Sequence, residues 1–459
     1  MNAIVLSAIW GVIMMFTGIL SKRSSVIRYI AIIGLILLLV CNVLELGGNR
    51  FFDFNVHNML VFDSFGLLFN CIAFASTLIF VLLSGRDMEK VGVHVAEYYA
   101  LIFFILCGIG VASSFNTLLM LFLGIEIISI PLYILTGSDK RNLKSNEASL
   151  KYFLMGAFST GLMLMGIALI YGAQGNFLIG YGANTLTPLM SAGLLLLLFS
   201  MAFKVSAAPF HFWTPDVYDG APTVFTSFMA TIVKAAAFIA FIRLFSGSFG
   251  NVQPQWQLMV AIITAATLLV GNITAVFQQS VKRMLAYSSI AQAGFMMFAI
   301  VALNNKASEG LIFYTAAYCL ATIGVFAILI KMKDYTFEGY NGLARTHPVL
   351  AATNAVFLLS LAGIPATAGF MAKFYMLSAA VNNGHVLWLV ILGVVCAAIS
   401  VYYYFRVIQA MYFKEGEEQE IITTPAFRGL LIGIAVIVIV LGIFPHWLID
   451  NLYYFIPDL

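Results

Sequence analysis

The chain has 459 residues, of which 62% are hydrophobic and 9% are charged, and its formal net charge is +3. A soluble domain carries about 25% charged residues, so this composition excludes a water-soluble globule, and it is the opposite of a disordered chain. The small, scattered charge also excludes a nucleic-acid partner. Long continuous apolar runs, unlike the alternating strands of a membrane barrel, predict an all-α polytopic protein in a lipid bilayer.

The apolar runs predict about fourteen transmembrane helices in a single integral membrane domain covering 1–459. Each run can cross roughly 30 Å of hydrocarbon at about 1.5 Å per residue. The predicted spans are 3–21, 26–45, 58–84, 97–115, 116–137, 148–172, 188–213, 222–247, 256–277, 285–303, 308–332, 348–380, 386–413 and 427–450. No basic residue precedes the first run, so we expect a retained span and not a signal peptide.

The cations between the spans separate by side. Fifteen follow odd-numbered spans, namely Lys22, Arg23, Arg28, Arg86, Lys90, Lys140, Arg141, Lys144, Lys282, Arg283, Lys331, Lys333, Arg345, Lys414 and Arg428. Two follow even-numbered spans, Arg50 and Lys306. The positive-inside rule then places the odd-numbered loops in the cytoplasm and both termini outside. The loop after the seventh span is an exception, because it holds Asp216 and Asp219 and no cation.

Four ionisable residues lie deep within apolar spans. They are Glu126 in the fifth span, Lys204 in the seventh, Lys234 in the eighth and Lys373 in the twelfth. A charge at mid-membrane costs about 2.5–3.5 kcal/mol on insertion scales, so such residues need a partner, water or an easily lost proton. A structural ion pair would explain Glu126 with one lysine but not the other two lysines. A row of buried amines with one carboxylate is typical of a proton relay.

Two further residues have open alternatives. Lys151 lies a few residues inside the sixth span, where it either snorkels to the cytoplasmic interface or joins the relay. His211 lies at the cytoplasmic end of the seventh span. It is either a satisfied polar residue or, with Asp216 and Asp219 nearby, part of an entry path for protons.

The seventh and twelfth spans are predicted to be broken. Pro209 follows Lys204 by five residues, and the twelfth span, about 33 residues long, contains Gly363, Pro365 and Gly369. Proline removes a backbone donor and clashes with the preceding turn. Because unwound backbone at membrane depth is tolerated where it lines protein or water, broken helices beside ionisable groups indicate an ion path.

The remaining polar and reactive residues have simpler expectations. Asp63 is expected to cap the third helix or face the interface, and Arg243 to be interfacial. The cysteines, expected to be small buried apolar side chains, are Cys41, Cys71, Cys107, Cys319 and Cys396. Their spacing fits no metal or iron–sulfur site, and there is no Gly-rich phosphate loop after a strand. We therefore expect no metal, cofactor or redox centre in this chain.

Three stretches resemble signatures of the antiporter-like membrane subunits of respiratory complex I, which are related to subunits of multisubunit sodium/proton antiporters. They are KVSAAPFHFWTPDVYDGAPT at 204–223, KRMLAYSSIAQAG at 282–294 and GIPATAGFMAKFY at 363–375. Within that family, Lys373 in place of glutamate disfavours the M-type subunit, and an end near residue 459 disfavours the L-type, which favours the N-type. Gln292 departs from the histidine of many relatives, and because glutamine cannot titrate, it is excluded from the relay.

The resemblance implies a fold with two inverted five-helix repeats, helices 4–8 at about 97–247 and helices 9–13 at about 256–413. It implies that Glu126 and Lys204 form a coupling ion pair, that Lys234 is the central relay and that Lys373 leads outside, with Lys151 as a further family lysine.

The implied function is proton translocation, without redox chemistry in this chain, as a subunit of NADH:quinone oxidoreductase in a bacterial inner membrane. NADH, FMN, iron–sulfur clusters and quinone are then expected in partner subunits, and the neighbours are an M-type subunit and small membrane subunits. The alternatives are a subunit of a multisubunit sodium/proton antiporter, a solute transporter and a non-conducting scaffold.

Overall fold

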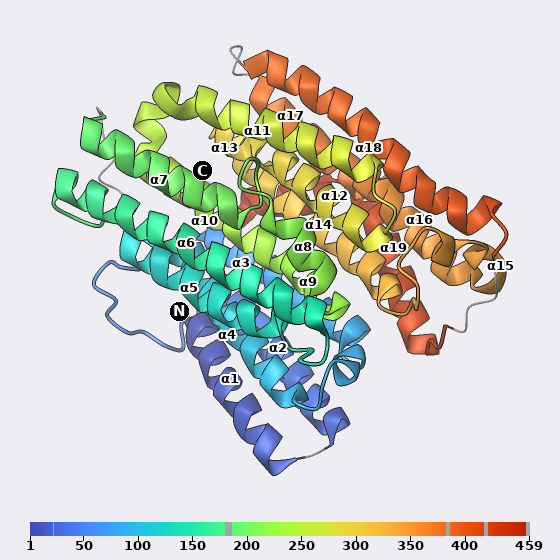
Figure 1. Cartoon of the computed structure of the whole chain (residues 1–459). Helices are drawn as coiled ribbons and strands as arrows, with labels where there is room; N and C mark the ends of the chain where they lie inside the picture. The colour runs from blue at the N-terminus through green and yellow to red at the C-terminus, as the bar shows by residue number, and fades with distance from the viewer. Residues whose placement is uncertain (22, 180–185, 382–385, 417–420, 456–459) are drawn as a thin grey trace.

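The chain folds into an almost entirely helical body whose long helices run side by side. A computed structural model describes residues 1–21, 23–179, 186–381, 386–416 and 421–455, with side chains described up to residue 450. Figure 1 shows the long helices running roughly parallel, from upper left to lower right in that view. Within the described ranges, β-type pairing is limited to three isolated bridges, so the predicted all-α class is confirmed.

The described α-helices vary in length from four residues to thirty-two, and short 3-10 and π turns lie among them. Their bounds are α1 (Asn2–Leu20), α2 (Ser24–Leu46), α3 (Ser64–Ser84), η1 (Asp87–Lys90), α4 (Val95–Ser114), α5 (Leu118–Thr136), α6 (Leu143–Gln174), α7 (Pro188–Lys204), α8 (Trp213–Gly220), α9 (Thr223–Phe228), η2 (Met229–Val233), α10 (Lys234–Phe249), η3 (Gly250–Val252), α11 (Gln253–Val276), α12 (Val281–Met296), α13 (Phe298–Ala302), α14 (Asn305–Leu329), η4 (Glu338–Tyr340), α15 (Leu343–Thr346), α16 (Pro348–Ala362), α17 (Ala368–Val381), α18 (Leu387–Phe413), α19 (Pro425–Ile443) and α20 (His446–Phe455).

These helices account for the predicted spans. In the described part of the chain, eleven helical stretches are long and apolar enough to cross a membrane. One of them, Thr223–Val276, is 54 residues long and carries both the eighth and the ninth predicted spans. The shorter apolar helices α7, α16 and α17 lie at the two spans that were predicted to be broken. The chain is therefore a multi-pass membrane protein.

Polar side chains at the helix starts fix several boundaries. The caps whose side chains accept a backbone N–H of the first turn are Asp63, Thr117, Asn142, Thr187, Asn304 and Thr424. Such a cap satisfies one of the donors that a helix start leaves without a partner. Two predicted starts were wrong for this reason. The third span starts after its cap Asp63 and not at 58, and the sixth starts after its cap Asn142 and not at 148.

Both predicted breaks are present. α7 ends at Lys204, and residues 205–212 separate it from α8, so the predicted span 188–213 is two elements. α16 ends at Ala362, followed by Gly363 with a φ of +84°, where a side chain would be strained, and α17 begins only at Ala368. The fourteenth predicted span, 427–450, is also too long, because α19 ends at Ile443 just before Pro445.

One interruption has no counterpart in the predictions. Met229–Val233 forms a π-helical turn between α9 and α10, immediately before Lys234. A π turn widens the backbone by one residue and occurs mostly at functional positions in helices. The eighth span is therefore locally distorted at its central lysine.

The most buried elements carry the polar residues of the interior. Nearly every residue of α12 and α14 is buried, and most of α10 is buried as well. By contrast, α1, α2 and α19 expose large apolar side chains along their length, as expected for helices that face lipid. Lys234 in α10 and Gln292 in α12 therefore lie in the core and not on the lipid-facing surface.

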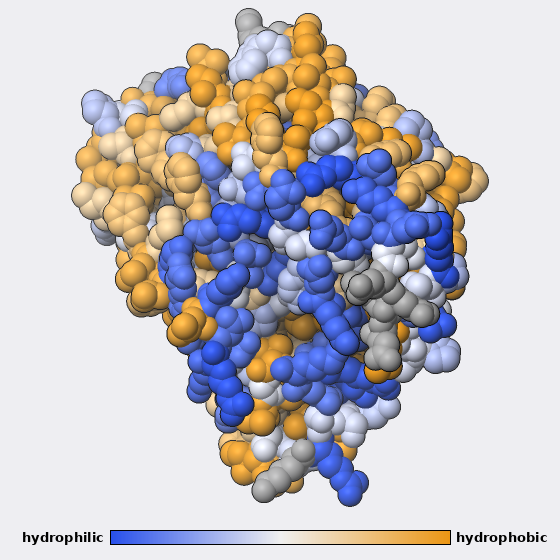
Figure 2. Space-filling model, turned by 45° about the vertical axis from the view of Figure 1, so that its right-hand side comes forward, coloured by the Kyte–Doolittle hydropathy of each residue, from blue (hydrophilic) through white to orange (hydrophobic). Residues whose placement is uncertain are grey.

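Hydrophilic side chains gather at one end of the helices. Figure 2 shows a broad hydrophilic area on the face that comes forward from the right-hand side of Figure 1, with hydrophobic surface around it. One pocket is lined by cations from three of the predicted odd-numbered loops, namely Arg28, Arg86, Lys90 and Lys331. The predicted grouping of these cations on one side is consistent with that pocket, although Lys22 lies outside the described residues. The membrane orientation and the two inverted repeats stay predictions.

Arg243 connects α10 with two other segments, 61–63 and 113–115, at the opposite ends of the helices. Its Nη1 donates to Asp63 Oδ2 at 2.6 Å and to the Ser113 carbonyl at 3.1 Å, and its Nε donates to the Phe115 carbonyl at 2.8 Å. Nη2 donates to the Val61 carbonyl at 3.3 Å. Asp63 thus caps α3 and binds α10 at once, which confirms its predicted capping role.

We expect Arg243→Ala to destabilise the fold by about 1–3 kcal/mol, because several carbonyls and a carboxylate lose their donor together. Thermal unfolding of the purified protein in detergent measures the change. Arg50→Ala, which removes the same charge from an exposed position, is the control. Equal melting curves for the two variants would show that the Arg243 contacts contribute nothing to stability.

Candidate functional site

A threonine lies between the predicted coupling residues Glu126 and Lys204. The hydroxyl of Thr160, in α6, donates to Glu126 Oε1 at 2.7 Å and accepts from Lys204 Nζ at 3.4 Å. Glu126 and Lys204 do not form an ion pair, because no ion pair within 4.0 Å among the described residues joins them. The predicted coupling contact is therefore made through one hydroxyl group and is not direct.

Lys204 is the last residue of α7, at the break of the seventh span. Its Nζ also donates to the Ser129 hydroxyl of α5 at 3.0 Å. The ammonium group is therefore solvated by two hydroxyls from neighbouring helices, and Glu126 lies one hydrogen bond further away. A charge at a helix C-terminus is also favoured by the helix dipole. The break thus provides an environment in which a membrane lysine is tolerated.

Lys234 follows the π turn and points to α12. Its Nζ donates to both the carbonyl and the hydroxyl of Ser289, at 2.9 Å and 3.0 Å. It also lies 5.8 Å from the ring centroid of Tyr218 in α8, within the range of a cation–π contact. Only 2% of Lys234 is exposed. In the described part of the chain, no carboxylate lies within ion-pair distance of it.

Lys373, in α17, reaches back across the break of the twelfth span. Its Nζ donates to the carbonyls of Leu361 and Ala362, at 3.0 Å and 2.9 Å, which the end of α16 leaves without helical partners. Nζ also lies 3.4 Å from the Ser400 hydroxyl and 4.8 Å from the ring centroid of Phe295. The break predicted from Gly363 and Pro365 therefore supplies the acceptors that hold this buried lysine.

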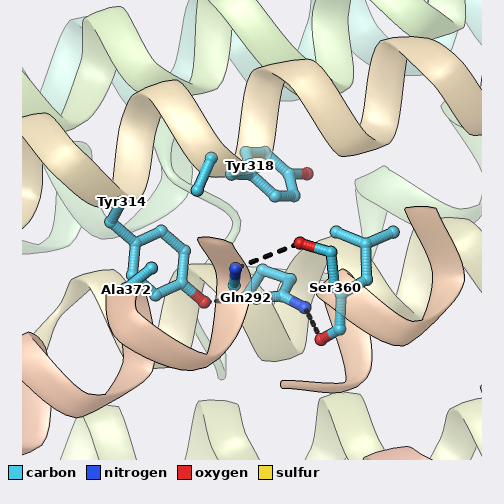
Figure 3. A pocket seen from close by; sticks show the side chains of 8 residues that line it. Gln292, Tyr314, Tyr318, Ser360 and Ala372 are labelled. Carbon is cyan, nitrogen blue, oxygen red and sulfur yellow. Dashed lines mark hydrogen bonds between the residues drawn. The ribbon is translucent and has the colours of Figure 1, made fainter. Parts of the chain in front are cut away.

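A polar network continues from Lys373 towards Lys234. The Leu361 carbonyl also accepts from Gln292 Nε2 at 2.9 Å. Gln292 in turn accepts from the Tyr314 hydroxyl and donates to the Tyr404 hydroxyl at 3.2 Å. Figure 3 shows Gln292 between Tyr314 and the broken end of α16.

The same network extends to Ser288, the residue next to Ser289, which is the hydrogen-bond partner of Lys234. Tyr404 is hydrogen-bonded to Ser288, which precedes Ser289 in α12. A cavity of about 10 Å³ is lined by Gln292, Tyr314 and Tyr318 among others, which is near the smallest space that holds one water molecule. Gln292 cannot titrate, but it belongs to the polar connection between the two lysines.

Asp216 and Asp219, which were predicted to lie in a loop, are part of the short helix α8, and Asp216 pairs with cations from distant helices. Lys151 Nζ pairs with Asp216 Oδ2 at 3.0 Å and with Glu147 Oε1 at 2.7 Å, and Arg283 Nη2 pairs with Asp216 Oδ1 at 3.2 Å. Lys151 therefore neither snorkels alone nor contacts the buried lysines, and its carboxylate partners lie in α6 and α8. Lys282 Nζ donates to the carbonyls of Asp219 and Ala221 at 2.8 Å and 2.7 Å.

His211 lies within the break between α7 and α8. It is buried and contacts the ring of Phe212 at a centroid distance of 4.5 Å. Its Nδ1 is buried and has no hydrogen-bond partner within the described part of the chain. The structure therefore does not join His211 to the Asp216 ion pairs, and its role in proton entry stays a prediction.

Sequence reasoning missed the neutral groups that hold the charged ones. Besides Gln292, the groups that contact the four ionisable residues or connect them are Ser129, Thr160, Tyr218, Ser288, Ser289, Tyr314, Ser400 and Tyr404. The only signal in the sequence was the presence of hydroxyl residues within apolar spans. The free cysteines do not take part in these contacts.

Comparison with known proteins places the chain in a family. The family model described as "NADH:quinone oxidoreductase/Mrp antiporter, TM" matches residues 115–400, which include Glu126, Lys204, Lys234 and Lys373. The chain belongs to this family of antiporter-like membrane subunits. It is 40% identical to NADH-quinone oxidoreductase subunit N of Cytophaga hutchinsonii, over 98% of this chain and 99% of that protein.

Other relatives agree with this placement. The chain is 37% identical to subunit N of Flavobacterium psychrophilum, over 97% of this chain and 99% of that protein. These matches confirm the predicted N-type membership. Among solved structures, a chain of respiratory complex I from Thermus thermophilus is 33% identical, with a TM-score of 0.85 and 98% of both chains covered.

A chain of the Mrp complex from Dietzia also has a TM-score of 0.85, covering 98% of this chain and 95% of that one, but it is only 19% identical. This last match shows a shared fold alone.

We expect Thr160→Val to slow proton transport by about tenfold or more while leaving the fold intact. Valine has the same shape but cannot connect Glu126 with Lys204, and a hydrogen bond to a charged group is worth about 1.5–3 kcal/mol. Proton uptake into vesicles containing the assembled complex measures the effect. Thr160→Ser should retain transport, because it keeps the hydroxyl.

Thr77→Val provides the matched control, since the Thr77 hydroxyl is buried and donates to the Ala73 carbonyl of its own helix. Transport at the unaltered rate in Thr160→Val would rule out a coupling role for this hydroxyl.

Proposed function

We propose that this chain is a proton-translocating, non-redox membrane-arm subunit of an NADH:quinone oxidoreductase in a bacterial inner membrane, with both termini on the outer side. NADH, FMN, iron–sulfur clusters and quinone belong to partner subunits in this proposal. The neighbours in the membrane are an M-type antiporter-like subunit and small membrane subunits. The whole-length likeness to subunit N proteins supports this assignment.

One observation carries the proposal. Each of the three membrane lysines lies at a departure from regular α-helix: Lys204 at the end of α7, Lys234 after the π turn, and Lys373 across the break after α16. Each Nζ is bonded to carbonyl or hydroxyl oxygens and not to a carboxylate among the described residues. Neutral acceptors can solvate the ammonium form of a lysine. When the lysine loses its proton, the neutral amine can also leave these acceptors without leaving a buried negative charge unpaired. A lysine in such surroundings is able to take up and release a proton.

Coupling starts at Glu126 in this scheme. A carboxylate close by stabilises the protonated form of an amine, so Lys204 keeps its proton while the connection through Thr160 is intact. Quinone reduction in a neighbouring subunit changes the position of Glu126 relative to Lys204. When the connection loosens, the proton leaves Lys204 for Lys234. Moving one charge against 100 mV needs about 2.3 kcal/mol, which is comparable to the worth of one such charged contact.

The second transfer runs from Lys234 to Lys373 and then outwards. The polar surroundings of this step are the hydroxyls of Ser289, Ser288 and Tyr404, the side-chain amide of Gln292 and the carbonyl of Leu361. Because Gln292 cannot carry a proton, transfer past it requires water. Water entering the small cavity beside Gln292 would complete the connection.

Proton entry is the least constrained step. Asp216 in α8, the helix that follows the break of the seventh span, forms an ion cluster with Lys151 and Arg283. Lys282 lines a pocket of about 360 Å³ together with Asp139 and Asp219. A polar pocket beside the broken helix is a suitable entry for water. His211, buried in the break itself, is a further participant in proton entry in this scheme.

A second candidate function is a subunit of a multisubunit sodium/proton antiporter. The shared fold with a chain of an Mrp complex favours it, and the same buried residues would serve it. Copurification separates the two: the oxidoreductase assignment requires partners that contain flavin and oxidise NADH. An assembly composed only of membrane proteins would support the antiporter.

We expect Lys234→Ala to abolish proton pumping coupled to NADH oxidation, because it removes the central titratable group from the polar path. The complex should still assemble, since Lys234 makes no ion pair among the described residues that its loss would disrupt. Proton uptake by inverted vesicles and assembly on native gels are the two measurements. Lys306→Ala, at an exposed position, is the control and should pump at the unaltered rate.

Normal pumping by an assembled Lys234→Ala complex would contradict the relay. It would favour the non-conducting scaffold, in which proton stoichiometry is insensitive to the buried lysines.

A further inference from the structure

A pocket of about 530 Å³ lies between α2, α3 and α19 at the hydrophilic end of the helices, away from the relay lysines. Arg28, Arg86, Lys90 and Lys331 line it together with Asp87. All of these residues lie within five residues of a helix end, so the pocket is placed at the depth of lipid headgroups.

The pocket has an excess of positive charge. Asp87 is buried, and it is already paired with Lys331 Nζ at 2.5 Å and Lys90 Nζ at 2.8 Å. Arg28 lies 3.8 Å from Glu89, a long contact for an ion pair. Arg86 is exposed, and none of the ion pairs of the described residues includes it. The guanidinium groups of Arg28 and Arg86 are therefore available to an anion, whereas Lys331 and Lys90 are already paired with Asp87.

The deeper part of the pocket is apolar. Ile32 and Tyr29 on α2, Leu82 on α3 and Leu430 on α19 line it further along the helices than the cations do. Leu82 is 47% exposed and Tyr29 60% exposed, on helices whose other apolar side chains are exposed too. The pocket thus opens towards the lipid-facing surface, with cations at the membrane boundary and apolar side chains below them.

Neighbouring contacts hold the cations in place. The stem of Arg28 lies across Gly85, where a Cβ atom would be 3.2 Å from Arg28 Cδ. Lys331 Nζ lies 5.1 Å from the ring centroid of Phe427 at the start of α19. Thr423 and Thr424, at the N-terminus of that 19-residue helix, also line the pocket, where the helix dipole favours a negative charge.

We propose that this pocket binds one anionic glycerophospholipid, with its phosphate between Arg28 and Arg86 and an acyl chain along Ile32, Leu82 and Leu430. Basic pockets between membrane helices on the cytoplasmic side are suited to such headgroups. The combination of two guanidinium groups, Arg86 without an ion pair among the described residues and Arg28 in a long one, with an apolar floor open to lipid matches a two-part ligand of this kind. The lipid would connect α2 with α19, which are distant in the sequence.

The test uses the intact complex containing the full chain, in vesicles of phosphatidylcholine doped with a photoactivatable analogue of either phosphatidylglycerol or phosphatidylcholine. After illumination, labelled peptides are identified by mass spectrometry. The phosphatidylglycerol analogue should label peptides of α2, α3 and α19 several-fold more than the phosphatidylcholine analogue. Arg86→Gln should reduce this preference about fivefold, since one basic residue at the membrane surface contributes about that factor.

Two variants sharpen the result. Arg86→Lys should restore the preference, because it keeps the charge. Arg141→Gln removes the same charge from an exposed loop outside the pocket and should leave the labelling of these peptides unchanged.

Equal labelling by the two lipid analogues would overturn the proposal. It would also be overturned if inorganic phosphate abolished the labelling, which would indicate a site for a soluble anion, or if cross-linking showed the pocket filled by a partner subunit. The labelling readout does not depend on proton transport, so failure here leaves the relay proposal unaffected.

Discussion

A lysine ammonium group inside a membrane needs oxygen acceptors, and in a regular helix the carbonyls already accept backbone N–H groups, so hydroxyls and helix ends are the readiest acceptors. This constraint organises the interior of the protein. Three helix interruptions in the described part of the chain supply acceptors to a lysine or place it against them. Lys373 takes two carbonyls released by the end of α16, and Lys234 takes the hydroxyl and carbonyl of Ser289 after the π turn. Lys204 ends its own helix and reaches hydroxyls of α5 and α6.

The choice of neutral acceptors has a functional consequence. A carboxylate beside each lysine would hold the proton firmly and fix the charge, as the ion pair of Arg243 with Asp63 does at the other end of α10. Hydroxyl and carbonyl groups hold an ammonium less strongly. Among the four ionisable residues deep within the predicted spans, the carboxylate Glu126 is half-buried and lies near the first lysine only, and even there Thr160 lies between the charges. The charges thus remain adjustable at the positions where the proposed proton transport needs them to be.

Much of this arrangement could be predicted from the sequence. Apolar runs gave the spans, and Pro209, Gly363 and Pro365 marked two breaks, because proline and glycine act on the backbone locally. The π turn before Lys234 could not be predicted, since Met229–Val233 has no residue that requires it. Contacts between distant segments were equally hidden. Asp216 appeared to lie in a loop without cations, yet Lys151 and Arg283 pair with it from α6 and α12.

The central claim is that the buried lysines share a hydrated path. A cryo-electron microscopy map of the assembled complex, at a resolution that shows ordered water, tests it most directly. The account predicts water density beside Gln292 and Tyr314 that connects the surroundings of Ser289 with Lys373 Nζ. A dry gap there, with tightly packed apolar side chains separating Lys234 from Lys373, would contradict it.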